Sequence, residues 1–361
     1  MFCSIVPPHI LQGLAERGDD EDRVRALAAL ELSAQPRAER QALALLAGPI
    51  TLPARRRRRW VFDAGSGEQL PGAVARSEGT PRVRDAAVNE AYDGAGRVYV
   101  FYRRNYGRFS VDDHAARLDS TVHFGTGFNN AHWNGRQMIY GDGDGKYFRR
   151  FTSALDVIAH ELTHGVTQYS AALSMSGQSG ALAEHFSDVF GALAKQYWSR
   201  QTAARADWLI GASLFTSRVN GVAIRSMKDP GSAYDDPVLG SDPQPSHMRG
   251  FVKTSADDRG VHINSGIPNH AFYRVATLLG GRAWETPGKI WYRALTRELG
   301  PRSQFQHCAD ATWRAAGELF GAGSEPQDAV LAAWKAVGIR VAAMEEVFVP
   351  PTAAAEVPLL A

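Results

Sequence analysis

The spacing of apolar residues along the chain separates a strand-rich first half from a helical second half. Between Trp60 and Tyr140, β-branched and aromatic residues recur with turn-forming residues between them, a pattern typical of strands. A helical pattern over residues 84–106 interrupts this alternation. We therefore expect a strand-rich N-terminal lobe, residues 59–168, with one early helix.

Helical spacing dominates the second half. Candidate helices follow one another at 187–200, 265–279, 289–298, 304–320 and 325–337. The last opens on Ser324 as a cap, with Pro326 in its first turn. We expect a helical C-terminal lobe over residues 169–341 and an extended tail at 342–361. With the strand-rich lobe, this predicts an α+β fold.

The first 58 residues form a module of their own. Residues 20–34 and 38–47 carry leucine, alanine and valine at helical spacing, and Pro36 separates them. The run Arg55–Arg59 follows. Adjacent like charges repel one another, so a solvated linker fits this run. An exposed junction is also where a protease can cut. A patch for nucleic acid or membrane fits less well, since the formal net charge of the chain is only +2.

One predicted helix, residues 156–168, carries the residues of a metal site. The motif HELTH at 160–164 places His160 and His164 about one turn apart, so both imidazoles leave the same helix face. Glu161 lies ~100° further round and can reach a metal-bound water without ligating the metal. The remaining positions are mainly apolar, which predicts a buried helix at the floor of a cleft.

A third candidate ligand, Glu184, follows in what reads as a second helix. Two imidazoles and one carboxylate leave the fourth position of a tetrahedral zinc site open for water, which marks a catalytic site. Asp188 lies one turn past Glu184 and can accept the second N–H of a ligating histidine. The alternatives are a capping or solvent-facing Glu184 and an ordinary surface Asp188.

The order and spacing of several motifs resemble the thermolysin family of neutral zinc metallopeptidases, from about Trp60 to Val341. The motifs are NNAHWNG at 129–135, YGDGDG at 140–145, HELTH at 160–164, GALAEHFSD at 180–188, RSM at 225–227 with Asp229-Pro230, and GVHINSG at 260–266. The resemblance implies a metalloendopeptidase with zinc on His160, His164 and Glu184 between two lobes. Glu161 would then act as general base and afterwards as general acid.

The same resemblance assigns roles outside the zinc site. His262 hydrogen-bonds the developing oxyanion, and Asp257 orients its ring. Arg225 binds a substrate carbonyl. The Asn130 side chain and the Ala131 carbonyl bind the substrate backbone as an added strand. The pocket for the residue after the scissile bond implies a preference for a bulky hydrophobic residue, because its lining positions are all apolar: Phe148, Phe151, Val157, Ile210 and Ile224.

The N-terminal stretch resembles the short propeptides of the protealysin-type branch, which carry a Pro-Pro motif. By that resemblance the chain is a precursor, and we expect it to remove residues 1–58 itself. Pro7 and Pro8 are expected to lie across the cleft without offering a cleavable geometry. Cys3 or His9 is a candidate latency ligand of the metal. A free terminal thiol is the alternative for Cys3.

Two positions near the zinc site depart from the family pattern. Met175 stands where the family usually has a tyrosine whose hydroxyl stabilises the tetrahedral intermediate, and a thioether donates no hydrogen bond. Loss of one such donor costs on the order of a hundredfold in kcat. Ala183 replaces an asparagine and removes a contact behind the glutamate ligand. The alternative function is therefore an impaired pseudoprotease that binds peptides or a protein partner.

A paired calcium site of the family is expected to be absent. Asp156 and Asp207 match two of its acidic ligands, but acids are missing at three further positions, occupied by Lys195, Leu209 and Ala212. The Lys195 ammonium can lie near either aspartate in place of a cation.

Composition limits the compartment and the partners. The chain is 44% hydrophobic and 22% charged, as soluble globular proteins usually are, and no stretch approaches the ~18 apolar residues of a membrane span. No secretory signal opens the chain, so we expect cytoplasmic synthesis, with any export by a non-classical route. Cys3 and Cys308 lie too far apart along the chain to suggest a disulfide framework. The expected partners are peptide or protein substrates, the chain's own propeptide and a proteinaceous inhibitor, but neither nucleic acid nor membrane.

Overall fold

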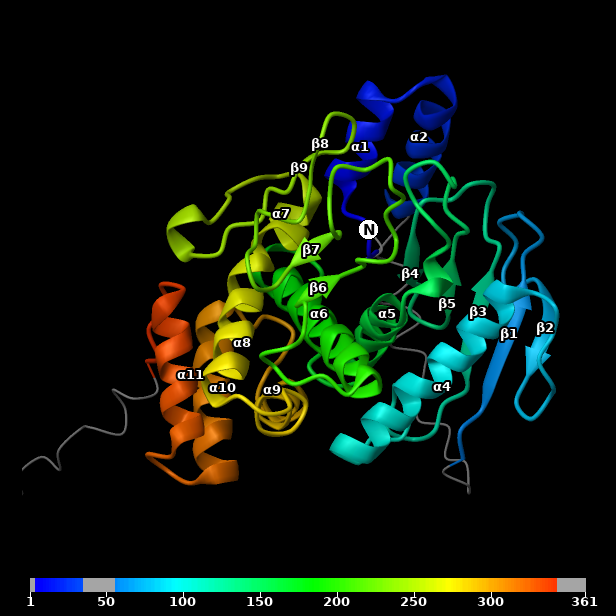
Figure 1. Ribbon diagram of the computed structural model, residues 1–361. Helices are drawn as coiled ribbons and strands as arrows, with labels where there is room; N and C mark the ends of the chain where they lie inside the picture. The colour runs from blue at the N-terminus through cyan, green and yellow to red at the C-terminus, as the bar shows by residue number, and fades with distance from the viewer. Residues whose placement is uncertain (1–3, 35–55, 343–361) are drawn as a thin grey trace, which may run out of the picture.

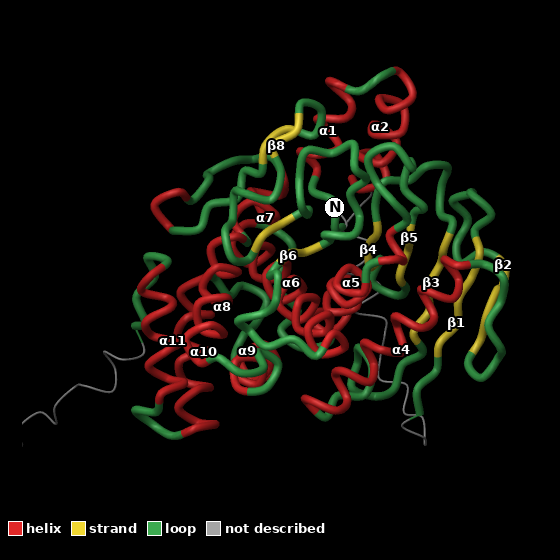
Figure 2. Tube along the Cα trace, viewed as in Figure 1, coloured by secondary structure: helices red, strands yellow, loops and turns green. Residues whose placement is uncertain are grey.

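A computed structural model describes residues 4–34 and 56–342, which form a sheet-based lobe and a helical lobe (Figure 1). The strands of the main sheet gather on one side of the molecule and most helices on the other (Figure 2). The prediction of an α+β fold is therefore confirmed. Cys3, the expected helix at 38–47, Arg55 and the tail from residue 343 onward lie outside the described residues.

The N-terminal lobe is a five-stranded mixed sheet with the order β2-β1-β3-β5-β4. Parallel pairs join β1 to β3 and β3 to β5, whereas β2 and β4 pair antiparallel at the two edges. The strand bounds are β1 Arg59–Asp63, β2 Ala73–Ser77, β3 Leu118–Val122, β4 Ala131–Trp133 and β5 Met138–Tyr140. The edge strand β4 thus comes from the motif that was predicted to bind a substrate backbone.

The early helix of this lobe, α4 Ala86–Tyr106, packs on β1 and β3. Its first turn is capped by Asp85, whose side chain accepts a hydrogen bond from the Val88 N–H. It ends at Gly107, which adopts a left-handed conformation with φ 70° that favours glycine. The sequence prediction of this helix, 84–106, agrees with the structure to within two residues.

Helices α5 Leu155–Gln168 and α6 Gly177–Ser199 pack against each other at the junction of the two lobes (Figure 1). Nearly every residue of α5 is buried, as its apolar pattern predicted. The rest of the C-terminal lobe consists of α7 Asp257–Asn264, α8 Gly266–Leu279, α9 Thr286–Arg297, α10 Phe305–Phe320 and α11 Glu325–Ala336. Short pairs β6 Leu209–Ile210 with β7 Arg225–Ser226, and β8 Asp235–Asp236 with β9 Gly240–Ser241, lie in the segment before α7.

Two N-terminal helices, α1 Pro8–Arg17 and α2 Asp20–Ala34, lie over the junction of the lobes (Figure 1). The helix α2 has the predicted bounds, but α1 was not predicted. Pro7 is its N-cap and Pro8 opens its first turn, a position where proline sacrifices no helical hydrogen bond. The Pro-Pro pair therefore starts a helix, and residues 4–6 precede it. No described helix is long and apolar enough to cross a membrane.

Candidate functional site

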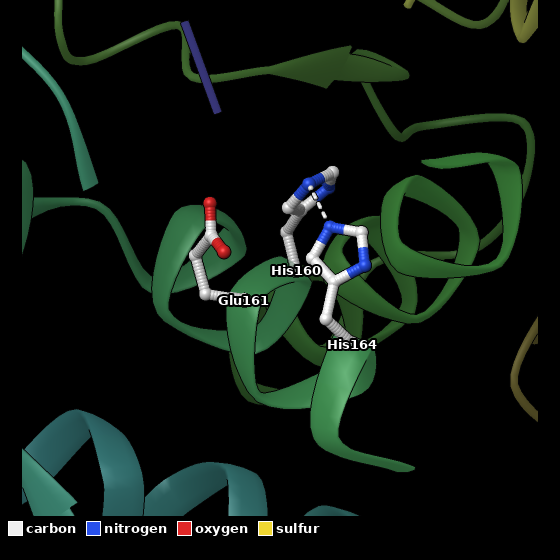
Figure 3. A group of neighbouring side chains, drawn as sticks. All are labelled: His160, Glu161 and His164. Atoms are coloured by element: carbon white, nitrogen blue, oxygen red, sulfur yellow. Dashed lines mark hydrogen bonds between the residues drawn. The ribbon is translucent and has the colours of Figure 1, made fainter. Parts of the chain in front are cut away.

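The floor of the site is the face of α5 that carries His160, Glu161 and His164. All three side chains are buried and rise from the same side of the helix (Figure 3). The Nε2 atoms of His160 and His164 lie 3.1 Å apart. The one-turn spacing predicted from the sequence thus brings both imidazole nitrogens to one point.

The helix α6 brings Glu184 to the same point. One Glu184 oxygen lies 3.5 Å from His160 Nε2 and the other lies 3.4 Å from His164 Nε2. Ligands about 2.0–2.1 Å from a tetrahedral zinc ion are separated by about 3.3 Å, so these spacings fit a shared zinc ion. Both Glu184 oxygens are fully buried and have no hydrogen-bond partner among the described residues, which is costly for a carboxylate unless a cation compensates it. The three residues therefore fit a zinc site.

Asp188, one turn further along α6, holds the His160 ring in place. Its Oδ1 lies 2.9 Å from His160 Nδ1, and Arg225 donates to both carboxylate oxygens at 2.8 Å. Asn269 donates to Oδ2 at 2.8 Å. Burial alone would raise the pKa of Asp188, but Arg225 and His160 outweigh it and hold the pKa below its ordinary value. An ionised Asp188 leaves the Nε2 atom of His160 available to a metal.

Glu161 is tied to the edge strand of the sheet. The backbone N–H of Trp133 in β4 donates to Glu161 Oε2 at 2.9 Å. This bond holds the Glu161 carboxylate beside the two histidines (Figure 3). The geometry is that of a base that can receive a proton next to a metal site.

His262 reaches the site from the helical lobe. Asp257 accepts from the His262 backbone N–H at 2.8 Å and lies 2.5 Å from His262 Nδ1. Three residues between them, Asp258, Arg259 and Gly260, have left-handed φ angles of 52°, 69° and 76°. This turn folds the aspartate back onto the ring, so His262 Nε2 lies 3.5 Å from the Glu184 carboxylate. The predicted pairing of His262 with Asp257 is present in the structure.

The N-terminal segment Ser4–Val6 lies against the site as an added strand. Ser4 forms an antiparallel bridge with His132 of β4, and the Ile5 N–H donates to the Ala131 carbonyl at 3.1 Å. The Val6 N–H donates to Asn130 Oδ1 at 3.0 Å. This is the β-augmentation that the edge strand was predicted to offer to a substrate.

The carbonyls of this segment meet the polar residues of the site in order along the strand. His262 Nε2 lies 3.1 Å from the Ser4 carbonyl oxygen, and Arg225 Nη1 donates to the Ile5 carbonyl at 2.9 Å. The Ile5 side chain is fully buried. It belongs to the same apolar core as the predicted pocket residues, all of which are buried: Phe148, Phe151, Val157, Ile210 and Ile224.

Of the two candidate latency ligands, His9 contacts a different residue, and Cys3 lies outside the described residues. His9 Nε2 lies 2.7 Å from the Tyr234 hydroxyl, and burial lowers the pKa of His9 to about 4. Its contact is therefore with Tyr234 and not with the three candidate ligands. Pro7 directly follows the bound Val6 and is the N-cap of α1, and Pro8 opens its first turn. Sequence reasoning missed Ser4, Tyr234 and Asn269, because each acts through contacts with residues far away in the chain.

Lys195 lies between Asp156 and Asp207, the two aspartates that match ligands of the calcium site that was expected to be absent. Its Nζ is 3.3 Å from Asp156 Oδ2 and 2.9 Å from Asp207 Oδ1, and it donates to the Leu209 carbonyl at 2.6 Å. Burial alone would lower the pKa of Lys195, but the two carboxylates raise it above its ordinary value. The ammonium thus supplies a positive charge at this point.

Replacing Lys195 with methionine is expected to destabilise the protein by about 2 kcal/mol, because the buried Asp156 loses its counter-charge. Millimolar calcium should leave the melting temperature of the wild-type chain unchanged and raise that of Lys195→Met. The exposed Lys289→Met is the matched control. A calcium-induced rise in the wild type would contradict the predicted absence of a paired calcium site.

Comparisons with known proteins agree with this geometry. The thermolysin metallopeptidase catalytic domain matches residues 66–168, and the thermolysin metallopeptidase alpha-helical domain matches residues 171–339. An extracellular metalloprotease of Pectobacterium carotovorum is 46% identical over 94% of this chain and 97% of its own length. A thermolysin of Alicyclobacillus acidocaldarius is 42% identical over 71% of this chain and 46% of its own length. The structure of the precursor of protealysin, a metalloproteinase from Serratia proteamaculans, superposes with a TM-score of 0.85 at 43% identity, covering 93% of this chain and 99% of that one.

Proposed function

The chain belongs to the thermolysin family of metallopeptidases, and we propose that it is a latent precursor that removes its own N-terminal segment and then cleaves peptides before bulky apolar residues. The family, the metalloendopeptidase activity and the zinc cofactor rest on the comparisons and the HExxH cluster. The self-processing and the preference for apolar residues are the proposal. The single observation that carries it is the position of Ser4–Val6 in the site.

The residues of the site have three separate roles in hydrolysis, namely metal binding, proton transfer and stabilisation of the oxyanion. His160, His164 and Glu184 would hold zinc, which supplies Lewis-acid polarisation and an acidified water when bound. Glu161 takes the proton of the attacking water and returns it to the leaving amine. His262 donates to the oxygen that becomes negative, with Asp257 holding its ring.

The contacts of the N-terminal segment support a particular direction and register for a bound substrate. The Ser4 carbonyl stands at His262 and the next carbonyl, of Ile5, stands at Arg225. A substrate in this register would be attacked at the carbonyl in the place of Ser4. The residue after the scissile bond would then occupy the place of Ile5, which is apolar and enclosed.

A peptide series tests this preference directly. Peptides that differ only after the scissile bond should be cleaved by the matured enzyme with kcat/KM at least about 100-fold higher for leucine or phenylalanine than for aspartate, since a buried unpaired carboxylate is costly. A zinc chelator should abolish the hydrolysis and added zinc should restore it. Equal rates for leucine and aspartate would contradict the register, whereas activity that survives chelation would contradict the zinc mechanism.

Latency should depend on Ile5. Replacing Ile5 with aspartate puts a carboxylate into an apolar, fully buried place and should weaken the hold of the N-terminal segment at least tenfold. The measurement is peptide hydrolysis by freshly purified full-length chain, followed by intact mass over time. Leu27→Asp is the matched control, because Leu27 lies on α2 with 53% of its surface exposed. If Ile5→Asp stays as latent as the wild type, residues 4–6 do not block the site.

A further inference from the structure

The chain contains two Pro-Pro pairs, and the residues before them are alike. The N-terminal motif is Ser4-Ile5-Val6-Pro7-Pro8, and the C-terminal motif is Val347-Phe348-Val349-Pro350-Pro351. Both read Val-Pro-Pro after a bulky apolar residue, which is Ile5 in one and Phe348 in the other. The C-terminal motif lies outside the described residues. The bound N-terminal motif therefore indicates what such a sequence can bind.

The cleft holds the N-terminal motif mainly by its backbone. The Ile5 N–H and carbonyl bind Ala131 and Arg225 at 3.1 and 2.9 Å. The Val6 N–H and carbonyl both bind the Asn130 side chain, at 3.0 and 3.3 Å. Any two non-proline residues in the same conformation offer these two N–H groups and two carbonyls. Phe348 and Val349 would therefore offer them as well. Two contacts of the Ser4 hydroxyl would be lost at Val347: the 3.0 Å bond from the Asn130 side chain and the 3.3 Å bond to the Val6 carbonyl.

The side chains of the C-terminal motif suit the same place. The side chains of Ile5 and Val6 are both fully buried, so the cleft accepts apolar residues at these two positions. A residue before proline is restricted to extended conformations, and this restriction applies to Val349 as it does to Val6.

We propose that the C-terminal motif is a second ligand of the cleft, which binds in the register of the N-terminal motif, with Phe348 in the place of Ile5, after residues 1–58 have been removed. The inference rests on the proposed function, since it requires that the N-terminal segment vacate the cleft. A cut at the arginine-rich junction releases the N-terminal motif but leaves the C-terminal motif attached. The matured enzyme thus carries its own competitor of substrate.

The site of its own chain and that of a second molecule offer the C-terminal motif the same hydrogen-bonding groups. The last described residue, Ala342, is held by a 2.7 Å hydrogen bond from its N–H to Asp310. The five residues from there to Val347 span at most about 17 Å when extended. Binding within one chain does not depend on protein concentration, whereas binding between two chains does.

Steady-state kinetics of the matured enzyme test the proposal. Wild type, Phe348→Asp and the control Leu359→Asp are compared on a peptide with leucine after the scissile bond. We expect the apparent KM of Phe348→Asp to be several-fold lower than that of the other two, with kcat unchanged, because a competitor has been removed. If the difference in apparent KM persists when the enzyme is diluted, the C-terminal motif binds the cleft of its own chain. If the difference disappears on dilution, the motif binds the cleft of a second molecule.

Intact mass is the second readout, because a bound C-terminal motif presents the Val347–Phe348 bond for cleavage. Loss of residues 348–361 from the wild type, but not from Phe348→Asp, would also support the register. Equal KM values without that cut would overturn the proposal and leave the peptidase function standing. If no variant hydrolyses the peptide, the proposed function itself fails, and the inference fails with it.

Discussion

Replacing Glu161 with glutamine is expected to lower kcat/KM by about 1,000-fold and to leave the N-terminal segment attached to the chain. A glutamine oxygen can still accept the Trp133 N–H that now binds Glu161 Oε2 at 2.9 Å, so the fold should be kept. The amide cannot take a proton from water, and a positioned base contributes on the order of 10²–10⁴ in rate.

The measurement is the intact mass of the wild type and of Glu161→Gln after identical handling, together with peptide hydrolysis and zinc content. Loss of about the first 58 residues only in the wild type would establish self-processing. The exposed Glu325→Gln is the control and should mature like the wild type. If both chains are trimmed alike, another protease performs the cut. A Glu161→Gln chain that hydrolyses peptides at the wild-type rate would refute the assigned base.

Replacing Asp188 with asparagine is expected to have the largest effect on stability, about 3–5 kcal/mol. Arg225 is only 1% exposed, and its guanidinium forms a buried ion pair with Asp188 through two hydrogen bonds of 2.8 Å. Removal of the carboxylate leaves that buried charge without its ion-pair partner, and only the more distant charges of Glu184 and Glu161 remain. The same change frees the His160 ring, which should weaken zinc binding by about 10–100-fold.

Thermal unfolding and zinc titration check this expectation, with Asp328→Asn as the control, because Asp328 is exposed on α11. The double variant Asp188→Leu with Arg225→Met should recover part of the lost stability, since removing both charges costs less than removing one. It should not recover zinc affinity, because leucine cannot hold the His160 ring. An Asp188→Asn chain with unchanged melting temperature and zinc affinity would show that the buried pair contributes little.

Local sequence patterns predicted the elements that carry the zinc site. The one-turn spacing of His160 and His164 needs only helix geometry, and the apolar residues of that helix already required it to be buried. The helices α2, α4, α10 and α11 were predicted to within two residues because their periodicity and termini are encoded locally. The helix α1 was missed, since its Pro7-Pro8 start looked like an extended segment.

Contacts between distant residues were not available to such reasoning. Arg225 and Asn269 both donate to Asp188 because the fold brings the three residues together. The contact of His9 with the Tyr234 hydroxyl likewise depends on the fold. The same holds for Ser4, whose carbonyl contacts His262 although 258 positions separate the two residues in the chain. No local pattern encodes these pairings, because their partners are separated by long stretches of sequence.

The sequence by itself thus determined the α+β class, the one-face arrangement of His160, Glu161 and His164, and the lysine that replaces an acid beside Asp156. The first two follow from residue type and short-range spacing, and the lysine follows from the resemblance to the family. Only the tertiary structure decided that Ser4–Val6 lies in the cleft as an added strand, with Ile5 enclosed and its carbonyl on Arg225. Strand addition depends on which edge of a sheet is left open and on what lies opposite it, and both are properties of the folded chain.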